Sequence, residues 1–139
     1  MPSSSNKKLS ILYTLQVLRD YSDENHLLSQ NDIVIKINNI YGMTCERKSI
    51  ATNIDSLIDF GYDIVKTNAG SYLASREFEP SEIRFLVDAV FSSKSINSKQ
   101  SRELAKKLSE FLSVYQRKQY KCLCNINSVS RKKHHGHHR

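Results

Sequence analysis

Hydrophobic residues between positions 44 and 61 recur at the spacing of an α-helix. They stand at i, i+4, i+7 and i+8, which forms one stripe at about 3.6 residues per turn: Ile50, Ile54, Leu57 and Ile58. Thr44 is a good N-cap, and Gly61 is the residue type that ends helices in the left-handed conformation. The pattern therefore predicts one helix from Thr44 to Gly61, with its apolar stripe facing a core.

The opposite face of this predicted helix is short, polar and partly basic near its N-terminus. At about 100° per residue, Lys48 and Thr52 fall opposite the apolar stripe, and Arg47 flanks them in the first turn. The residues beside them are Cys45, Ser49 and Ser56. Such a face suits a helix that enters a DNA major groove, although an ordinary amphipathic helix with a solvated face has the same pattern.

Two more helices are predicted before this one. The first spans residues 7–21, with Ser5 as its cap and one apolar side formed by Leu9, Ile11, Leu12, Leu15 and Leu18. Ser29 and Asp32 resemble a capping box that opens the second helix, although its β-branched run also fits a strand. We favour a helix because its apolar positions also have helical spacing: Ile33, Ile37, Ile40 and Tyr41. A tight connection through Gly42 then predicts a helix-turn-helix.

After Gly61 the hydrophobic pattern changes from helical to alternating. Residues 62–67 and 71–74 alternate, and the turn-forming residues Asn68, Ala69 and Gly70 separate them, so we predict a β-hairpin. Three helices followed by a hairpin predict a winged helix, in which Lys66 and Asn68 lie near the sugar-phosphate backbone. A hairpin that only closes the core explains the tip residues equally well.

A pair of helices is predicted after the hairpin. Pro80 opens the first, which runs to Ser92, and Asn97 with Gln100 opens a longer one that runs to about Lys118. We expect the two helices to pair and to offer their remaining apolar surface to a second copy of the chain. The expected dimerisation residues are Leu104, Leu108, Phe111, Leu112 and Tyr115.

These elements predict a mainly helical α+β chain in three parts. A winged helix-turn-helix domain spans residues 1–75, a helical hairpin for dimerisation spans residues 76–118, and a basic flexible tail spans residues 119–139. The net charge is +7, yet seven of the 21 Lys and Arg residues lie from Arg117 onward, where there is no acid. The 14 basic residues before Arg117 match the 14 Asp and Glu residues, so attraction to a polyanion depends on local patches or on the tail.

The sequence gives little support to catalysis or to a bound cofactor. The four Gly residues are not clustered into a phosphate-binding loop, and His26 has no evident catalytic partner, so we predict no enzyme and no cofactor. The tail contains Cys122, Cys124, His134, His135, His137 and His138, but their spacing does not match a structural zinc module, and we predict no metal site.

The sequence also predicts a cytoplasmic location. Three cysteines without framework spacing fit a reducing compartment rather than a disulfide scaffold. No apolar run approaches the roughly 20 residues that span a bilayer, and the Ser-rich start lacks the apolar core of a signal peptide. We therefore expect no membrane partner.

Several segments resemble a known family in their order and spacing. The run RKSIATNIDSL from Arg47 is similar to a recognition helix, GYDI from Gly61 and GSYL from Gly70 look like its hairpin, and residues 82–108 look like its helical linker. Together, from about Lys7 to Leu112, they resemble the N-terminal half of WYL-domain transcriptional regulators, which have a DeoR-like winged helix-turn-helix. The resemblance implies a DNA-binding regulator.

Two departures from the family limit what the resemblance implies. Thr52 and Asn53 stand where the family usually has an Arg-Asp pair, so the DNA contact of that pair is not carried over. The ligand-sensing WYL domain has no counterpart in the sequence, so the effector-sensing role is not carried over either. We expect a short form of the family, or a phage or mobile-element relative that kept the DNA-binding half.

The sequence therefore predicts a regulator of transcription, a repressor, that binds double-stranded DNA as a homodimer. Two copies of the predicted recognition helix would enter successive major grooves about 34 Å apart. We expect Lys48, Ser49 and Thr52 to face base edges. The expected phosphate contacts and other interface residues are Arg47, Lys66, Asn68, Lys7, Lys8, Thr44 and Asn53.

Two other functions fit the sequence. The charge balance of residues 1–116 also suits a protein-binding module, such as a phage-encoded inhibitor that docks on a host enzyme or nucleoprotein. A nucleic-acid binder of low specificity that depends on the basic tail is the weaker alternative.

Overall fold

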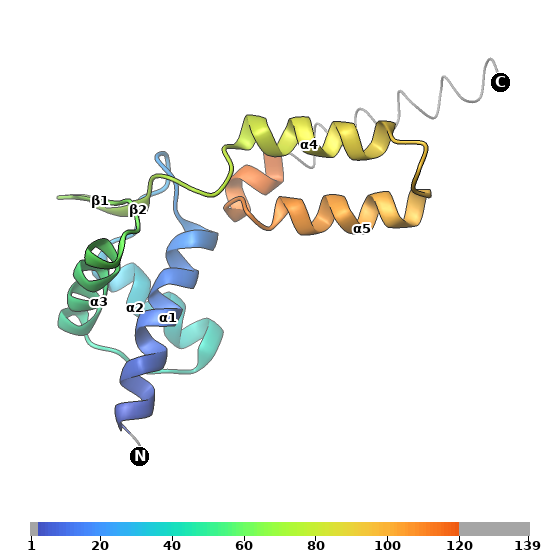
Figure 1. Cartoon of the computed structure of the whole chain (residues 1–139). Helices are drawn as coiled ribbons and strands as arrows, with labels where there is room; N and C mark the ends of the chain where they lie inside the picture. The colour runs from blue at the N-terminus through green and yellow to red at the C-terminus, as the bar shows by residue number, and fades with distance from the viewer. Residues whose placement is uncertain (1–2, 120–139) are drawn as a thin grey trace. The chain divides into compact units, whose positions relative to one another are not determined.

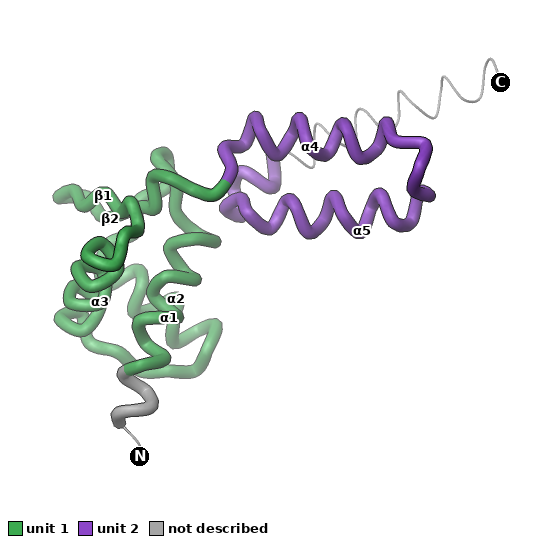
Figure 2. The backbone as a smooth tube through the Cα atoms, in the orientation of Figure 1, with its two compact units in different colours: residues 1–77 green, residues 78–139 purple. Residues whose placement is uncertain are grey.

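The structure is a computed structural model that describes residues 3–119, with side chains from Lys8 onward. It forms two compact units, residues 1–77 and residues 78–139 (Figure 2). Apart from Gln119, the predicted tail lies outside the described residues, and so do the Cys and His residues considered above for a metal site. No helix in the described part is long and apolar enough to cross a membrane.

Unit 1 is a winged helix-turn-helix. Its helices α1 (Ser3–Tyr21), α2 (Gln30–Tyr41) and α3 (Arg47–Phe60) precede an antiparallel hairpin of β1 (Ile64–Thr67) and β2 (Gly70–Leu73) (Figure 1). The predicted fold class, mainly helical α+β, is confirmed. All five elements contribute to one buried core, formed by Val17, Leu18, Leu28, Ile33, Ile37, Ile50, Ile54, Leu57, Ile64 and Leu73.

The face that helix α1 turns to the core overlaps the predicted one in part: Leu18 is fully buried, and Ile11 and Leu15 pack partly against the core. Ser10, Thr14, Val17 and Leu18 are buried, whereas Leu12, expected in the core, is 59% exposed. The Thr14 hydroxyl can be buried because it donates to the Ser10 carbonyl oxygen at 2.7 Å, inside the same helix. The apolar pattern missed part of the inward face, because two of its four buried positions are hydroxyl residues.

Helix α2 begins as predicted, and the helix interpretation is confirmed over the strand. Ser29 Oγ accepts from the Asp32 N–H at 3.0 Å, and Asp32 Oδ2 accepts from the Ser29 N–H at 2.9 Å, which completes the capping box. Gly42 ends the helix with a φ of 71°. One apolar position of α2 differs from the prediction, since Ile40 is 45% exposed. In α1, Ser5 lies inside the helix and is not the cap that had been predicted.

The hairpin forms in the predicted place and packs closely on the segment before α2. Ile64 pairs with Leu73 and Thr67 with Gly70, while Leu28 and Ser71 exchange two backbone hydrogen bonds of 2.9 and 2.7 Å. A Cβ added to Gly70 would lie 2.7 Å from the Leu28 carbonyl carbon, and the φ of Gly70 is 148°. Glycine is needed here because the Leu28 backbone crosses so close to the strand.

The end of unit 1 is tied to the C-terminal part of α1. The Arg76 guanidinium donates to the Arg19 carbonyl oxygen at 2.8 Å and to the Ser22 carbonyl oxygen at 2.6 Å. Arg19 also forms an ion pair with Glu77, with a nitrogen–oxygen distance of 2.7 Å. These contacts explain why the division falls after Glu77, two residues later than the predicted domain boundary.

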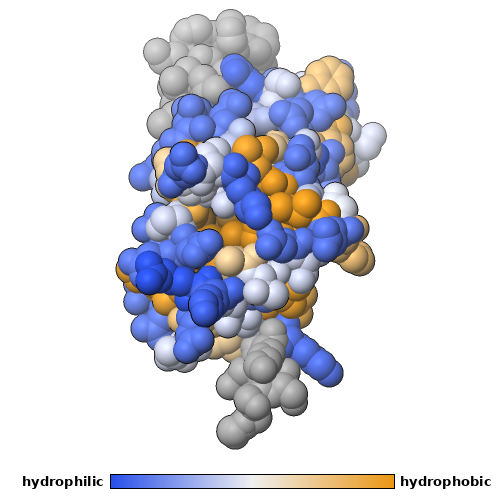
Figure 3. All heavy atoms as spheres, turned by 90° about the vertical axis from the view of Figure 1, so that its left-hand side faces the viewer, coloured by the Kyte–Doolittle hydropathy of each residue, from blue (hydrophilic) through white to orange (hydrophobic). Residues whose placement is uncertain are grey.

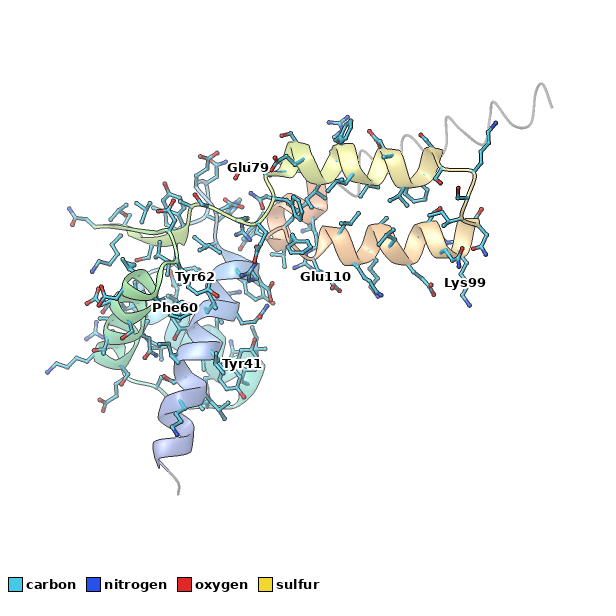
Figure 4. All side chains as sticks on the ribbon, in the orientation of Figure 1. Tyr41, Phe60, Tyr62, Glu79, Lys99 and Glu110 are labelled. Atoms are coloured by element: carbon cyan, nitrogen blue, oxygen red, sulfur yellow. The ribbon has the colours of Figure 1, made fainter. Side chains whose placement is uncertain are left out.

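Unit 2 contains α4 (Pro80–Ser92) and α5 (Ser98–Ser109), which lie side by side (Figure 1). Both begin as predicted, and the capping box of Asn97 and Gln100 is confirmed. Glu79 and Glu82 form a second capping box at α4; in Figure 4, Glu79 lies at the start of α4 and Glu110 just beyond α5. The buried core of unit 2 consists of Ile83, Val87, Ala105 and Leu112.

The predicted long helix to Lys118 is wrong, because α5 ends at Ser109 and a short helical segment follows over residues 114–119. In the break, Leu112 turns into the core and is only 1% exposed. Ser113 Oγ accepts from the Gln116 N–H at 3.1 Å, and Gln116 Oε1 accepts from the Ser113 N–H at 3.0 Å. This capping box is visible in the sequence and marks the restart of the helix.

Candidate nucleic-acid interface

Helix α3 begins two residues later than predicted, so its N-cap is Glu46 rather than Thr44. The helix starts at Arg47 after Glu46, which makes no capping hydrogen bond with its side chain. Met43 and Cys45 are partly buried against the core of unit 1, and burial raises the pKa of the Cys45 thiol. Burial alternates from residue to residue here, which is typical of an extended chain. Cys45 therefore lies on the core side and not on the outer face of α3, where the sequence had placed it.

The N-terminal half of the outer face of α3 is open to solvent. Arg47, Lys48, Ser49 and Thr52 are all exposed, while Ile50 and Ile54 on the opposite side are buried. The predicted orientation of the helix is therefore confirmed. A shallow groove runs along this face between α3 and α1, lined by Ser10, Lys48, Ser49, Thr52 and Asn53.

The Asn53 side chain joins α3 to α1. Its amide nitrogen Nδ2 donates to Ser10 Oγ at 2.7 Å and lies 3.2 Å from Thr14 Oγ1. The side chain is partly buried, and both of its protein partners belong to α1. These bonds engage the amide donors of Asn53 in holding α3 against α1, and a DNA contact through Asn53 stays a prediction.

The C-terminal half of the same face is acidic. Asp55 and Asp59 are exposed, and the Lys66 ammonium of the hairpin lies 2.6 Å from Asp55 Oδ1. Helix α3 then ends at Phe60, and Gly61 follows as its C-cap with a positive φ of 132°, which differs from the left-handed helical conformation that was predicted. The outer face is thus basic and hydroxyl-rich at its start and carboxylate-rich towards its end.

An open cleft of about 590 Å³ lies between the start of α2, the start of α3 and the hairpin. Arg47 and Lys66 contribute cations to its wall, and Asn68 and Asn31 contribute amide side chains. Helix α2 also begins at this cleft, so the positive end of its dipole adds to the two cations. The cleft thus brings together three of the predicted phosphate contacts, which are far apart in sequence.

The Thr67 side chain holds the tip of the hairpin, a role that was not predicted. Thr67 Oγ1 donates to the Gly70 carbonyl oxygen at 2.7 Å and accepts from the Ala69 and Gly70 N–H groups at 3.1 and 3.2 Å. A Thr three residues before Gly in a tight turn is the signal that indicates such a cap. Lys66 and Asn68 are exposed on either side of it.

Hydrophilic side chains cover much of the face shown in Figure 3, around a narrower hydrophobic area. Of the two predicted phosphate contacts at the start of α1, Lys8 is exposed, and the side chain of Lys7 lies outside the described residues.

At the C-terminal end of α3, Phe60 is 81% exposed and stacks on Tyr62 with ring centres 5.9 Å apart (Figure 4).

The predicted dimerisation residues divide into two groups. Leu112 is buried in the core of unit 2, so that prediction is wrong for Leu112, and Leu108 and Phe111 pack partly against the same core. Leu104 is 41% exposed, and Tyr115 is partly exposed. Among the large apolar side chains described in unit 2, the most exposed is one that was not predicted, Phe85 on α4, at 72%.

The described residues show a pairing of His26 but no metal-binding cluster. His26 Nδ1 lies 2.8 Å from Asp23 Oδ1, within the turn after α1. Among residues 3–119, no group of three or more His, Cys, Asp or Glu side chains could hold a metal ion. The pair stabilises the turn and is not part of the interface.

No family model, no curated protein and no solved structure matches this chain.

Proposed function

We propose that the protein is a sequence-specific regulator of transcription, a repressor, that binds double-stranded DNA as a homodimer. The observation that carries the proposal is the open N-terminal half of the outer face of α3, where Lys48, Ser49 and Thr52 are exposed. Side chains of this size and chemistry suit base edges in a major groove. The resemblance to the N-terminal half of WYL-domain regulators points in the same direction.

The cleft beside this face supports the proposal with a second feature. Arg47 from α3, Lys66 and Asn68 from the hairpin, and the start of α2 line one open concavity next to the groove-reading residues. Such an arrangement suits a phosphate of the DNA strand that borders the major groove. These contacts would fix the register of α3, and Lys48 and Thr52 would supply sequence preference.

The test begins by enriching duplexes from a random pool with the purified full-length protein. The double variant Lys48→Ala, Thr52→Ala is then compared with the wild type on an enriched duplex and on random duplex. We expect the preference for the enriched duplex to fall at least tenfold, since each good base contact is worth about 1–3 kcal/mol of discrimination.

The matched control is Lys94→Ala, which removes one exposed cation from the loop between α4 and α5. It should leave the preference unchanged. Failure to enrich any sequence, or a double variant that discriminates as well as the wild type, would contradict the proposal.

A second candidate function rests on the exposed aromatic side chain at the end of α3. Phe60 is exposed and stacks on Tyr62, which is partly buried against the core of unit 1, and large aromatic side chains are common anchors of protein interfaces. The protein would then act as an inhibitor that docks on another protein. A nuclease-treated pull-down separates the two functions: a stoichiometric partner that is lost in Phe60→Ser supports this one, and recovery of nucleic acid alone before nuclease supports the first.

A further inference from the structure

The outer face of α3 carries a carboxylate where a DNA-binding helix would approach the duplex. Asp55 follows Thr52 by three positions and Lys48 by seven, so the three side chains share one stripe of the helix. The Asp55 side chain is 60% exposed. A negative charge at this place repels phosphates, and it opposes the contribution of Lys48 and Arg47.

Asp55 is also the residue that holds the cation of the hairpin. Lys66 Nζ lies 2.6 Å from Asp55 Oδ1, so the ion pair links the hairpin to α3. The same Lys66 borders the cleft that suits a phosphate. Its ammonium group therefore has two competing anions, the Asp55 carboxylate in the free protein and a phosphate in a complex.

The exposure of both partners makes this competition possible. The Lys66 and Asp55 side chains are 54% and 60% exposed, and ion pairs in water contribute little to stability. A phosphate can therefore displace the carboxylate without disturbing the core. The displacement still leaves Asp55 without its counter-ion close to the DNA, which lowers the net gain.

We propose that Asp55 restrains DNA binding electrostatically: it holds Lys66 and repels phosphates, and so weakens binding to DNA of arbitrary sequence. This inference rests on the proposed DNA-binding function. On a preferred sequence, base contacts near the start of α3 outweigh this cost, whereas a random sequence supplies no such contacts and is bound weakly. Asp55 is thus a residue of the interface that lowers affinity for DNA.

The test measures binding of the full chain to a short duplex of random sequence over a series of KCl concentrations. Asp55→Asn keeps the size of the side chain and removes the charge. We expect it to bind roughly tenfold more tightly near physiological salt, with a salt dependence steeper by about one unit, since Lys66 becomes a full phosphate contact.

Two further variants separate the ion pair from a general charge effect. Asp59→Asn removes the same charge from the same exposed face, one turn further along α3, and should change affinity much less than Asp55→Asn. In a Lys66→Gln background, Asp55→Asn should lose most of its effect, because no hairpin cation remains to be released.

The outcomes distinguish this inference from the proposed function. If the wild type binds DNA and Asp55→Asn behaves like Asp59→Asn, or keeps its full effect without Lys66, the inference is overturned and the proposed function stands. If no variant binds any duplex, the proposed function fails and the inference fails with it.

Discussion

The two units are stabilised by contacts of different range. In unit 1, Asn53 reaches Ser10 across 43 positions, and the Leu73 N–H donates to the buried Ser22 hydroxyl across 51 positions. In unit 2, the capping hydrogen bonds of all three helical segments join residues three positions apart. The buried apolar core is also larger in unit 1, with ten residues against four among the described ones.

This difference suggests how stability and function are divided. Unit 1 has the core and the long-range polar contacts that a precise surface needs, and it carries the candidate interface. Unit 2 has a smaller core among the described residues. We therefore expect unit 1 to be the more stable unit and to unfold as one cooperative body, and four measurements test that expectation.

The largest effect is expected from a cavity in the core of unit 1. Ile37 is fully buried in α2, so Ile37→Ala should lower the free energy of unfolding of unit 1 by about 2–5 kcal/mol. Hydrogen exchange followed by mass spectrometry reports each unit separately, and exchange should rise throughout α1, α2 and α3.

The matched control is Ile35→Ala on the same helix, where the side chain is 49% exposed. It should change the free energy of unfolding by less than about 1 kcal/mol. Faster exchange confined to α2 would show that unit 1 does not unfold cooperatively, and equal acceleration in unit 2 would show that the two units share one transition.

A methyl group at Gly70 should have the next largest effect. Gly70→Ala places a Cβ 2.7 Å from the Leu28 backbone and forces Ala to a φ near 148°, so we expect a loss of about 3 kcal/mol. Gly42→Ala is the control, since its Cβ would meet nothing within 4 Å and only the left-handed φ costs about 1 kcal/mol. Equal losses in the two variants, measured by thermal unfolding, would mean that the Leu28 crossing is not tight.

Asn53 tests whether the polar contacts between α1 and α3 stabilise the interface helix. Asn53→Ala leaves the buried Thr14 and Ser10 hydroxyls without the amide donor and should cost about 1–2 kcal/mol. The neighbour Thr52→Ala is exposed and should change stability by less than about 0.5 kcal/mol while lowering DNA discrimination. A Thr52 variant that is less stable than the Asn53 variant would reverse the assignment of the two residues.

The sequence predicted best those features whose signals are local. The starts of α2, α4 and α5 follow from Ser29, Pro80 and Asn97, because the capping partner lies three residues away or the proline itself sets the first turn. The buried hydroxyl positions of α1 were missed because the partners that satisfy them include a residue about 40 positions away. The end of α5 was missed because the apolar spacing continues through Leu112 and outweighed the local capping signal of Ser113 and Gln116.

The same distinction applies to the candidate site. The exposure of Lys48 and Thr52 follows from helical periodicity alone and was predicted correctly. The pairing of Asp55 with Lys66 depends on where the hairpin lies against α3. The sequence alone does not give that position, so it could not predict the ion pair. The same applies to Asn53, because its hydrogen bonds to Ser10 and Thr14 on α1 could not be inferred from the sequence.

The smallest effect is expected from the ion pair at the end of unit 1. Arg19 donates to Glu77 Oε1 at 2.7 Å and holds the pKa of that carboxyl below its usual value near 4.5. A lowered pKa in the folded state stabilises the protein above the unfolded pKa, and the stabilisation is lost as the pH falls through the folded pKa. Because Glu77 is 49% exposed, the contribution should stay below about 1 kcal/mol.

Urea unfolding of the wild type and of Glu77→Gln tests this sign directly. We expect the wild type to be more stable by a few tenths of a kcal/mol at about pH 7, and the difference to shrink towards zero as the pH falls below about 4. Glu24→Gln, in the exposed turn after α1, controls for the loss of one negative charge. A stability difference that grows on acidification would mean that Glu77 does not anchor the end of unit 1 to α1, and that the long-range contacts of unit 1 stop at Arg76.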